Sequence, residues 1–149
     1  MNLPSKFPLL SLFMPKGVEY CQIGSRRYMN APNSDYDVMF HPEDRHYVIE
    51  HLSKMGVDYI KGNSGSIKFS LEVFPTERFF VSGINYLEVN YCFIEDYEAW
   101  RLATEAMLSI SKITPTYFDN RTKWNRLKLF SGLVASHGGQ PITLSDPSY

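Results

Sequence analysis

The spacing of hydrophobic and polar residues predicts an alternation of strands and helices along the chain. Apolar residues recur at helical spacing in three stretches, which predicts helices over 42–55, 97–111 and 120–135. Elsewhere the apolar residues alternate with polar ones or form short β-branched and aromatic runs, as in strands. The predicted strands cover 18–23, 36–40, 57–61, 67–74, 78–81 and 84–93. This order predicts an α+β fold with a mixed sheet, one helix after the second strand and two helices towards the C-terminus.

Turn-forming and capping residues mark the ends of these elements. Asp96 is placed to cap the second helix with its carboxylate. The Gly- and Ser-rich segment 62–66 lies between two predicted strands, so it predicts a hairpin turn rather than a phosphate-binding loop. Ser82-Gly83 predicts the turn of a second hairpin. The polar residues 26–34 predict a loop between the first two strands.

The length of 149 residues fits one domain that is large enough to form its own core. We expect this domain to cover residues 1–136, and the Gly-, Pro- and Ser-rich residues 137–149 to form a flexible tail. No apolar run approaches the roughly 18 residues of a membrane span, and no cleavage site follows the apolar stretch 7–14. Cys21 and Cys92 show no CxxC spacing, which is typical of reduced thiols and predicts a cytoplasmic protein.

The formal net charge of −1 hides an uneven distribution along the sequence. Residues 1–34 and residues 99–149 each carry a net charge of +3, whereas residues 35–98 carry −7. An acidic middle between basic ends fits a cation site flanked by anion-binding segments, and it fits a solvated acidic face equally. The near-zero total argues against a protein that binds a long stretch of nucleic acid.

The residues that carry chemistry lie between 21 and 40. Asp35 and Asp37 are separated by one residue in an extended segment, so both carboxylates project from the same face of a strand. Two carboxylates held that close repel each other unless a cation lies between them, and oxygen ligands of this kind suit Mg²⁺. Gly24-Ser25 ends the preceding strand, where a Gly lets backbone N–H groups approach a phosphate and a Ser adds a hydroxyl donor. The Asp-x-Asp pair alone also fits an exposed edge strand.

The combination of motifs is more specific than either motif alone. A Gly-Ser pair, nine residues, then Asp-x-Asp and an apolar run resemble the signature of the DNA polymerase β-like nucleotidyltransferase superfamily, especially its minimal single-domain members. The resemblance implies a nucleotidyltransferase core in which Asp35 and Asp37 bind two Mg²⁺ (or Mn²⁺) ions and an NTP is the substrate. The residues implied to bind the nucleotide are Gly24, Ser25, Arg26, Arg27 and Ser34. The motif covers residues 18–40, and the order of elements extends the resemblance to about residue 93.

The resemblance also implies a third carboxylate on a later strand, and two glutamates share the local sequence Leu-Glu-Val. Glu88 lies in the longer predicted strand, where Tyr86, Glu88 and Asn90 alternate onto one face. Glu72 is the alternative. We favour Glu88 as the third catalytic and metal-binding residue.

The function implied is a Mg²⁺-dependent enzyme that moves NMP from an NTP to an acceptor hydroxyl of a small molecule, a protein or an RNA end. The alternative is a catalytically inactive nucleotidyltransferase-like module that binds a protein or nucleic-acid partner. The bulky Arg26-Arg27-Tyr28 segment and a Glu in place of the commoner third Asp favour that alternative. We do not expect a template-copying polymerase in a chain of this length. We expect a homodimer, because a small domain of this kind often completes its acceptor pocket with a second subunit.

The other polar clusters give weaker signals. The three histidines His41, His46 and His51 lack the spacing of a zinc site. The basic residues of the last predicted helix fit a nucleotide or nucleic-acid contact and a solvated helix face equally; they are Arg121, Lys123, Arg126 and Lys128.

Overall fold

The computed structural model of the chain has an α+β fold, which confirms the predicted class. It describes the backbone of residues 14–29, 35–55, 59–61, 72–73, 77–84 and 87–144. Side chains are described for residues 14–29, 35–55 and 89–142.

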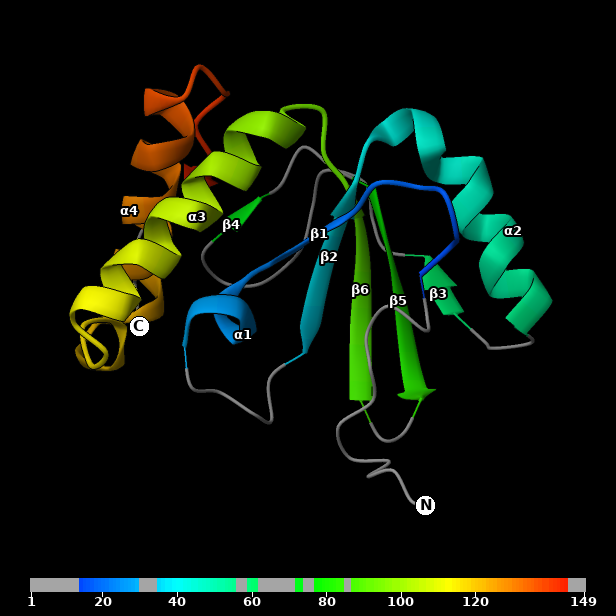
Figure 1. Ribbon diagram of the computed structural model, residues 1–149, viewed down its shortest axis with the longest axis horizontal. Coiled ribbons are helices and arrows are strands. Elements are labelled where there is room, and N and C mark those ends of the chain that lie inside the picture. Colours follow the sequence, from blue (N-terminus) through cyan, green and yellow to red (C-terminus); the bar gives the residue numbers. More distant parts are fainter. Residues whose placement is uncertain are drawn as a thin grey trace.

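A mixed sheet of five strands forms the centre of the molecule (Figure 1). Its strands, in spatial order, are β1 (Cys21–Ile23), β2 (Tyr36–Phe40), β6 (Leu87–Phe93), β5 (Glu77–Ile84) and β3 (Tyr59–Lys61). The central pair β2–β6 is parallel, and the other three pairs are antiparallel. A parallel pair needs a crossover connection, and here the chain between β2 and β6 includes a helix, as expected for such a connection. Two further strands, β4 (Glu72–Val73) and β7 (Thr143–Leu144), form a separate small sheet.

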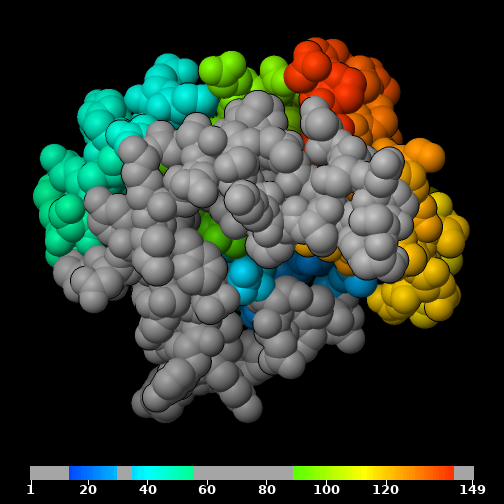
Figure 2. Space-filling view, turned by 180° about the vertical axis from the view of Figure 1, so that it is seen from behind, coloured from blue at the N-terminus to red at the C-terminus, as the bar shows by residue number. Residues whose placement is uncertain are grey.

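Helices lie on both sides of the central sheet. The described helices are α1 (Ser25–Tyr28), α2 (Arg45–Met55), α3 (Tyr97–Ile113) and α4 (Lys123–Ser136), with short 3₁₀ turns η2 (Pro42–Asp44) and η3 (Phe118–Asn120) before α2 and α4. Figure 1 shows α2 on one side of the sheet and α3 with α4 on the other. The same two flanks are seen from behind in Figure 2. The predicted helix after the second strand and the two C-terminal helices are therefore present.

The sheet separates two hydrophobic clusters because successive residues of a strand point to opposite faces. Val38 and Phe40 of β2 pack with Val48 and Leu52 of α2. Met39, between them in sequence, belongs to the cluster under α3 and α4. Val38, Met39 and Phe40 are fully buried, and burial of such side chains contributes about 1.5–3 kcal/mol each.

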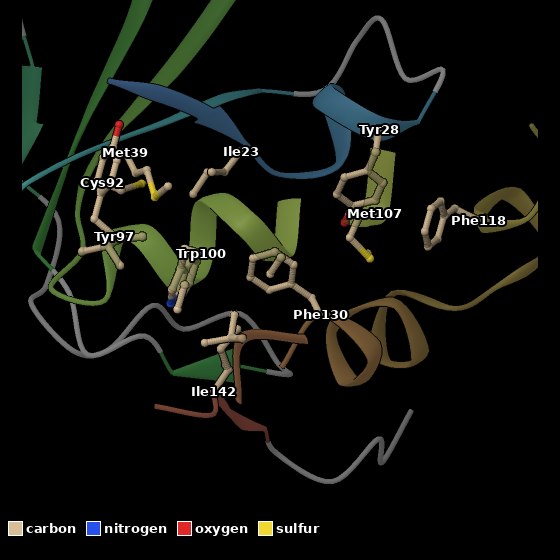
Figure 3. Packing of buried hydrophobic residues seen from close by; sticks show 14 residues of the cluster. Ile23, Tyr28, Met39, Cys92, Tyr97, Trp100, Met107, Phe118, Phe130 and Ile142 are labelled. Carbon is tan, nitrogen blue, oxygen red and sulfur yellow. The ribbon is translucent and has the colours of Figure 1, made fainter. Parts of the chain in front are cut away.

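The larger cluster lies between the sheet, α3 and α4 (Figure 3). Trp100 of α3 meets Phe130 of α4 edge-on, with ring centroids 5.1 Å apart. Tyr28 of α1 packs on Phe118, with ring centroids 4.9 Å apart. The short helix α1 is thereby fixed to the C-terminal half of the chain.

The predicted hairpin of strands 57–61 and 67–74 is not seen among the described residues, and most of its second strand, 67–71, lies outside them. In the structure β3 pairs with β5, while β4 pairs with β7 in the second sheet. The turn expected at 62–66 lies outside the described residues. Local alternation identifies extended segments, but it does not specify which distant segment each one pairs with.

The two strands of the second predicted hairpin are present and pair with each other. β5 and β6 are antiparallel, but Ser82-Gly83 lies inside β5 rather than between the strands. The pairing register shifts between Val81 and Ile84. A Gly within a strand is typical of such a bulge, whereas the local sequence alone predicts a turn there.

Two capping and loop predictions also differ from the structure. Asp96 precedes α3, but its Oδ2 accepts a hydrogen bond from the backbone N–H of Gln140 at 2.8 Å instead of capping the helix. Residues 26–28, predicted as loop, form part of α1. The rest of that predicted loop, 30–34, lies outside the described residues.

Part of the predicted flexible tail is packed against the body. Ser131 Oγ of α4 accepts a hydrogen bond from the N–H of Ile142 at 2.9 Å and donates one to its carbonyl at 3.3 Å. The Ile142 side chain is buried in the larger cluster, and β7 follows it. Residues up to 144 therefore contribute to the folded unit. Among the described helices, none has the length and apolar character needed to cross a membrane.

Candidate functional site

Gly24 brings the end of β1 into direct contact with Asp37 of β2. Its φ of +83° lies in the region that glycine adopts without strain. A Cβ atom at this position would lie 3.1 Å from both Cβ and Cγ of Asp37 and would overlap Asp37 Oδ2. The β1–β2 register explains the approach, since Ile23 is directly opposite Asp37. The two sequence motifs, Gly-Ser and Asp-x-Asp, therefore meet in space.

Asp35 and Asp37 lie at the beginning of β2. Alternation along the strand places Asp37 on the same face as Met39, which is the face covered by α3 and α4. Asp35 directly precedes β2 and continues this alternation. Both aspartates are partly buried. The face that is apolar further along the strand thus becomes acidic at its beginning.

The parallel partner strand β6 adds two polar positions to this face. Asn90 is directly opposite Asp37 in the β2–β6 register. Glu88, two residues earlier in β6, falls by alternation on the face of Asn90, beside the beginning of β2. Glu72, the alternative third carboxylate, belongs to β4 in the second sheet. Strand pairing therefore brings the backbone of Glu88, and not that of Glu72, next to the Asp-x-Asp strand; neither glutamate side chain is among those described.

Asn90 makes a direct contact with Asp37 that the sequence pattern does not predict. Its Nδ2 donates a hydrogen bond to Asp37 Oδ1 at 2.9 Å. The residue is 4% exposed, and its side-chain Oδ1 has no hydrogen-bond partner among the described residues. The sequence placed Asn90 on the face of Glu88. The cross-strand register that sets it against Asp37 has no local signal in the sequence.

The two arginines of the predicted phosphate-binding segment have partners within the chain. Arg26 stacks on the ring of Tyr36, with its Cζ 4.1 Å from the ring centroid. Arg27 donates to the carbonyl of Gln22 at 2.9 Å and lies 3.7 Å from a carboxylate oxygen of Glu105 on α3. Arg27 therefore joins β1 to α3, and neither guanidinium is shown in contact with the two aspartates.

The remaining predicted nucleotide-binding residues are placed only in part. Ser25 begins α1, directly after Gly24. Ser34 lies outside the described residues. Among the side chains that the structure describes, no group of three or more His, Cys, Asp or Glu is arranged to hold a metal ion. Glu88 is not among those side chains, so the proposed three-carboxylate set is not covered by that finding.

Two titratable groups with raised pKa values, one partly buried and one buried, lie further along the same side of the sheet. Burial raises the pKa of the Cys21 thiol, and the nearby Arg27 guanidinium opposes this shift. Burial, reinforced by Glu19, raises the pKa of Tyr97 well above its usual range. The Tyr97 ring stacks on His41, with centroids 3.9 Å apart, and Tyr97 Oη is buried without a hydrogen-bond partner among the described residues.

The basic residues near the C-terminus are held partly by aromatic rings. Arg121 lies over Tyr117 and Lys128 over Trp124, with 4.1 Å and 4.9 Å between charge and ring centroid. The first contact flanks η3 and the second lies on α4, and neither gives a separate sign of a ligand. The histidines 41, 46 and 51 form no metal-binding group with described residues.

The residues of the Asp37 site fit a divalent cation in three respects. The donors are oxygens, as Mg²⁺ prefers. The Asn90 amide leaves a buried acceptor oxygen without a described partner beside the Asp37 carboxylate. Gly24 lets the turn after β1 approach the Asp37 carboxylate more closely than any residue with a Cβ could. Asp37 is thus held between two strands with one oxygen at the amide and the other at the glycine.

Comparison of the chain with protein-family models, curated proteins and solved structures found no significant match.

Proposed function

We propose that the protein is a Mg²⁺-dependent nucleotidyltransferase that moves NMP from an NTP to an acceptor hydroxyl. The observation that carries this proposal is the contact between Gly24 and Asp37. It joins a Gly-Ser turn, suited to phosphate, to a pair of carboxylates, suited to a cation. A strand that carries a further acidic residue, Glu88, lies parallel and adjacent to the second motif.

The proposed roles follow from the chemistry of each side chain. Asp35 and Asp37 hold the cations, and Glu88 completes the acidic set or accepts the proton of the acceptor hydroxyl. Ser25 and the backbone beside Gly24 orient the β- and γ-phosphates. When bound, the cations neutralise the triphosphate and lower the pKa of the acceptor hydroxyl. The acceptor oxygen forms a bond to the α-phosphorus as the bond to the bridging oxygen breaks, and pyrophosphate leaves.

The test is pyrophosphate release and transfer of label from α-labelled NTPs in the presence of Mg²⁺. Acceptors from each class are supplied: small-molecule hydroxyls, proteins and RNA 3′ ends. We expect Asp35→Asn and Asp37→Asn each to reduce transfer by ~100-fold or more, because each removes a charge that binds the cation. The matched control is Asp119→Asn, at an exposed aspartate in η3. Wild-type transfer by both site variants, with circular dichroism unchanged, would refute the proposal.

One observation favours a second candidate function, a nucleotidyltransferase-like binding module without catalysis. Both Arg26 and Arg27 have partners within the chain, so neither is held ready for a triphosphate. The two functions are separated by calorimetric titration of ATP, CTP, GTP and UTP with and without Mg²⁺. A catalytic protein binds an NTP more tightly with Mg²⁺. No Mg²⁺-dependent binding at millimolar nucleotide would support the binding module.

A further inference from the structure

We propose that Asn90 is a positioning residue for Asp37, and that its amide fixes the orientation in which the carboxylate meets a divalent cation. The inference rests on the proposed cation site. It adds a residue from the parallel strand whose role is to orient a ligand rather than to carry charge.

The first observation is that Asp37 is held from two sides. Asn90 Nδ2 donates to Asp37 Oδ1 at 2.9 Å. On the other side, Asp37 Oδ2 lies so close to Gly24 that no Cβ could be accommodated there. One oxygen is thus held by an amide of β6 and the other lies at the turn after β1. Rotation of the carboxylate would break the first contact or strain the second.

The second observation is the unused acceptor of the same amide. Asn90 is 4% exposed, and its Oδ1 lacks a hydrogen-bond partner among the described residues. A buried acceptor without a partner destabilises a fold, and an apolar side chain of similar size would avoid this cost. The amide cannot be reversed, because two oxygens would then face each other. The hydrogen bond that Asn90 donates to Asp37 therefore explains why an asparagine occupies this position.

Charge explains why the position carries an amide instead of a carboxylate. Residue 90 is directly opposite Asp37 in the parallel pair, and Asp35 and the proposed Glu88 lie two residues earlier on the two strands. A carboxylate at 90 would face Asp37 as a like charge and would require a cation to hold the two together. The amide holds Asp37 in place before any cation binds.

The test uses Mn²⁺ and Mg²⁺ alone, without nucleotide. Free Mn²⁺ is measured by electron paramagnetic resonance for the wild type, Asn90→Leu and Asn90→Asp, with Asn125→Leu as the control at an exposed residue of α4. Removal of a group that orients a metal ligand weakens metal binding by roughly 10–100-fold. We expect that loss in Asn90→Leu with a Tm within about 3 °C of the wild type, and no change in Asn125→Leu.

The aspartate variant tests the charge argument. We expect Asn90→Asp to unfold at lower temperature than the wild type without divalent cation, and to gain more from added Mg²⁺ than the wild type does. The double variant Asp37→Asn/Asn90→Asp restores one amide and one carboxylate with the roles exchanged. We expect it to recover the thermal stability that Asn90→Asp loses without cation.

Nuclear magnetic resonance gives a readout that a structural role would not move. We expect the side-chain Nδ2H₂ resonance of Asn90, assigned by its loss in Asn90→Leu, to shift on addition of Mg²⁺. The side-chain amide of Asn125 stays unchanged. The inference about Asn90 is overturned if Asn90→Leu binds Mn²⁺ as tightly as the wild type. It is also overturned if the Asn90 side-chain amide does not shift while the backbone amides of 35–37 do. Either result leaves the proposed cation site unaffected. If the wild type binds Mn²⁺ and Asn90→Leu binds it more weakly, but no nucleotidyl transfer is found, only the proposed function is overturned. If the wild type does not bind Mn²⁺, both the proposed function and the inference about Asn90 are overturned.

Discussion

Replacement of Gly24 by alanine tests the contact on which the site depends. Gly24 has φ +83° and ψ 176°, a combination that is essentially confined to glycine. Forcing an alanine into it costs about 1–3 kcal/mol. The added Cβ would also lie 3.1 Å from Cβ and Cγ of Asp37 and overlap its Oδ2, so that the carboxylate must move.

Displacement of Asp37 has its own cost. An off-rotamer side chain costs about 0.5–1.5 kcal/mol. Weakening of the hydrogen bond from Asn90 adds about 1 kcal/mol, because the partly buried carboxylate regains some solvent contact. We therefore expect Gly24→Ala to lower the free energy of unfolding by about 2.5–5.5 kcal/mol, the sum of the backbone, rotamer and hydrogen-bond costs.

The assay is equilibrium urea unfolding followed by tryptophan fluorescence, with comparable m-values as the condition for comparing variants. The control is Gly138→Ala, because Gly138 has a similar φ of +85° but no atom within 4 Å of a built Cβ. Its cost is about 1–2 kcal/mol, from the backbone alone. Equal destabilisation by the two alanines, within about 0.5 kcal/mol, would show that Gly24 does not press against Asp37.

Three further substitutions test contacts elsewhere in the fold. Ser131→Ala leaves the N–H and carbonyl of Ile142 without their partner, so we expect a loss of about 2–3 kcal/mol in urea unfolding, against less than about 0.5 kcal/mol for the exposed Ser136→Ala. Thr122→Ala removes the hydroxyl that caps α4 and is expected to cost about 1 kcal/mol in the same assay. Tyr97→Phe removes a buried hydroxyl whose pKa is raised in the folded state. Above about pH 10 the unfolded wild type loses this proton while the folded wild type keeps it, so the free energy of unfolding of the wild type falls as pH rises. Urea unfolding at pH 7 and pH 10.5 should show a smaller alkaline loss in Tyr97→Phe, and an identical loss contradicts this account.

Local pattern was sufficient for the parts of the fold that depend on neighbouring residues. The strand 36–40 is present as predicted, since the continuous apolar run Val38, Met39 and Phe40, typical of a strand buried on both faces, is visible directly in the sequence. The helix 42–55 is also present, with Pro42 in its opening 3₁₀ turn. The Asp-x-Asp pair could be placed on one face because every second residue of a strand lies on the same face.

Pairing between distant segments could not be predicted from local pattern. The partner of β4 is β7, and nothing in the sequence near Glu72 or Thr143 indicates this pairing. Asn90 is the corresponding case within the site. Its alternation with Glu88 was visible, but its contact with Asp37 depends on the register of a parallel pair. Register is fixed by the packing of whole faces, which a single strand does not encode.

The parallel β2–β6 pair also determines when the site can exist during synthesis. Gly24 and Asp37 are joined by a local antiparallel pair, whereas Asp37 and Asn90 meet only after more than fifty intervening residues have been made. A nascent chain that has emerged only as far as α2 carries both sequence motifs but lacks the strand that orients them. Closing so long a connection is entropically costly and slow compared with forming a hairpin. The site is therefore completed late in folding, when β6 pairs with β2 and brings Asn90 against Asp37.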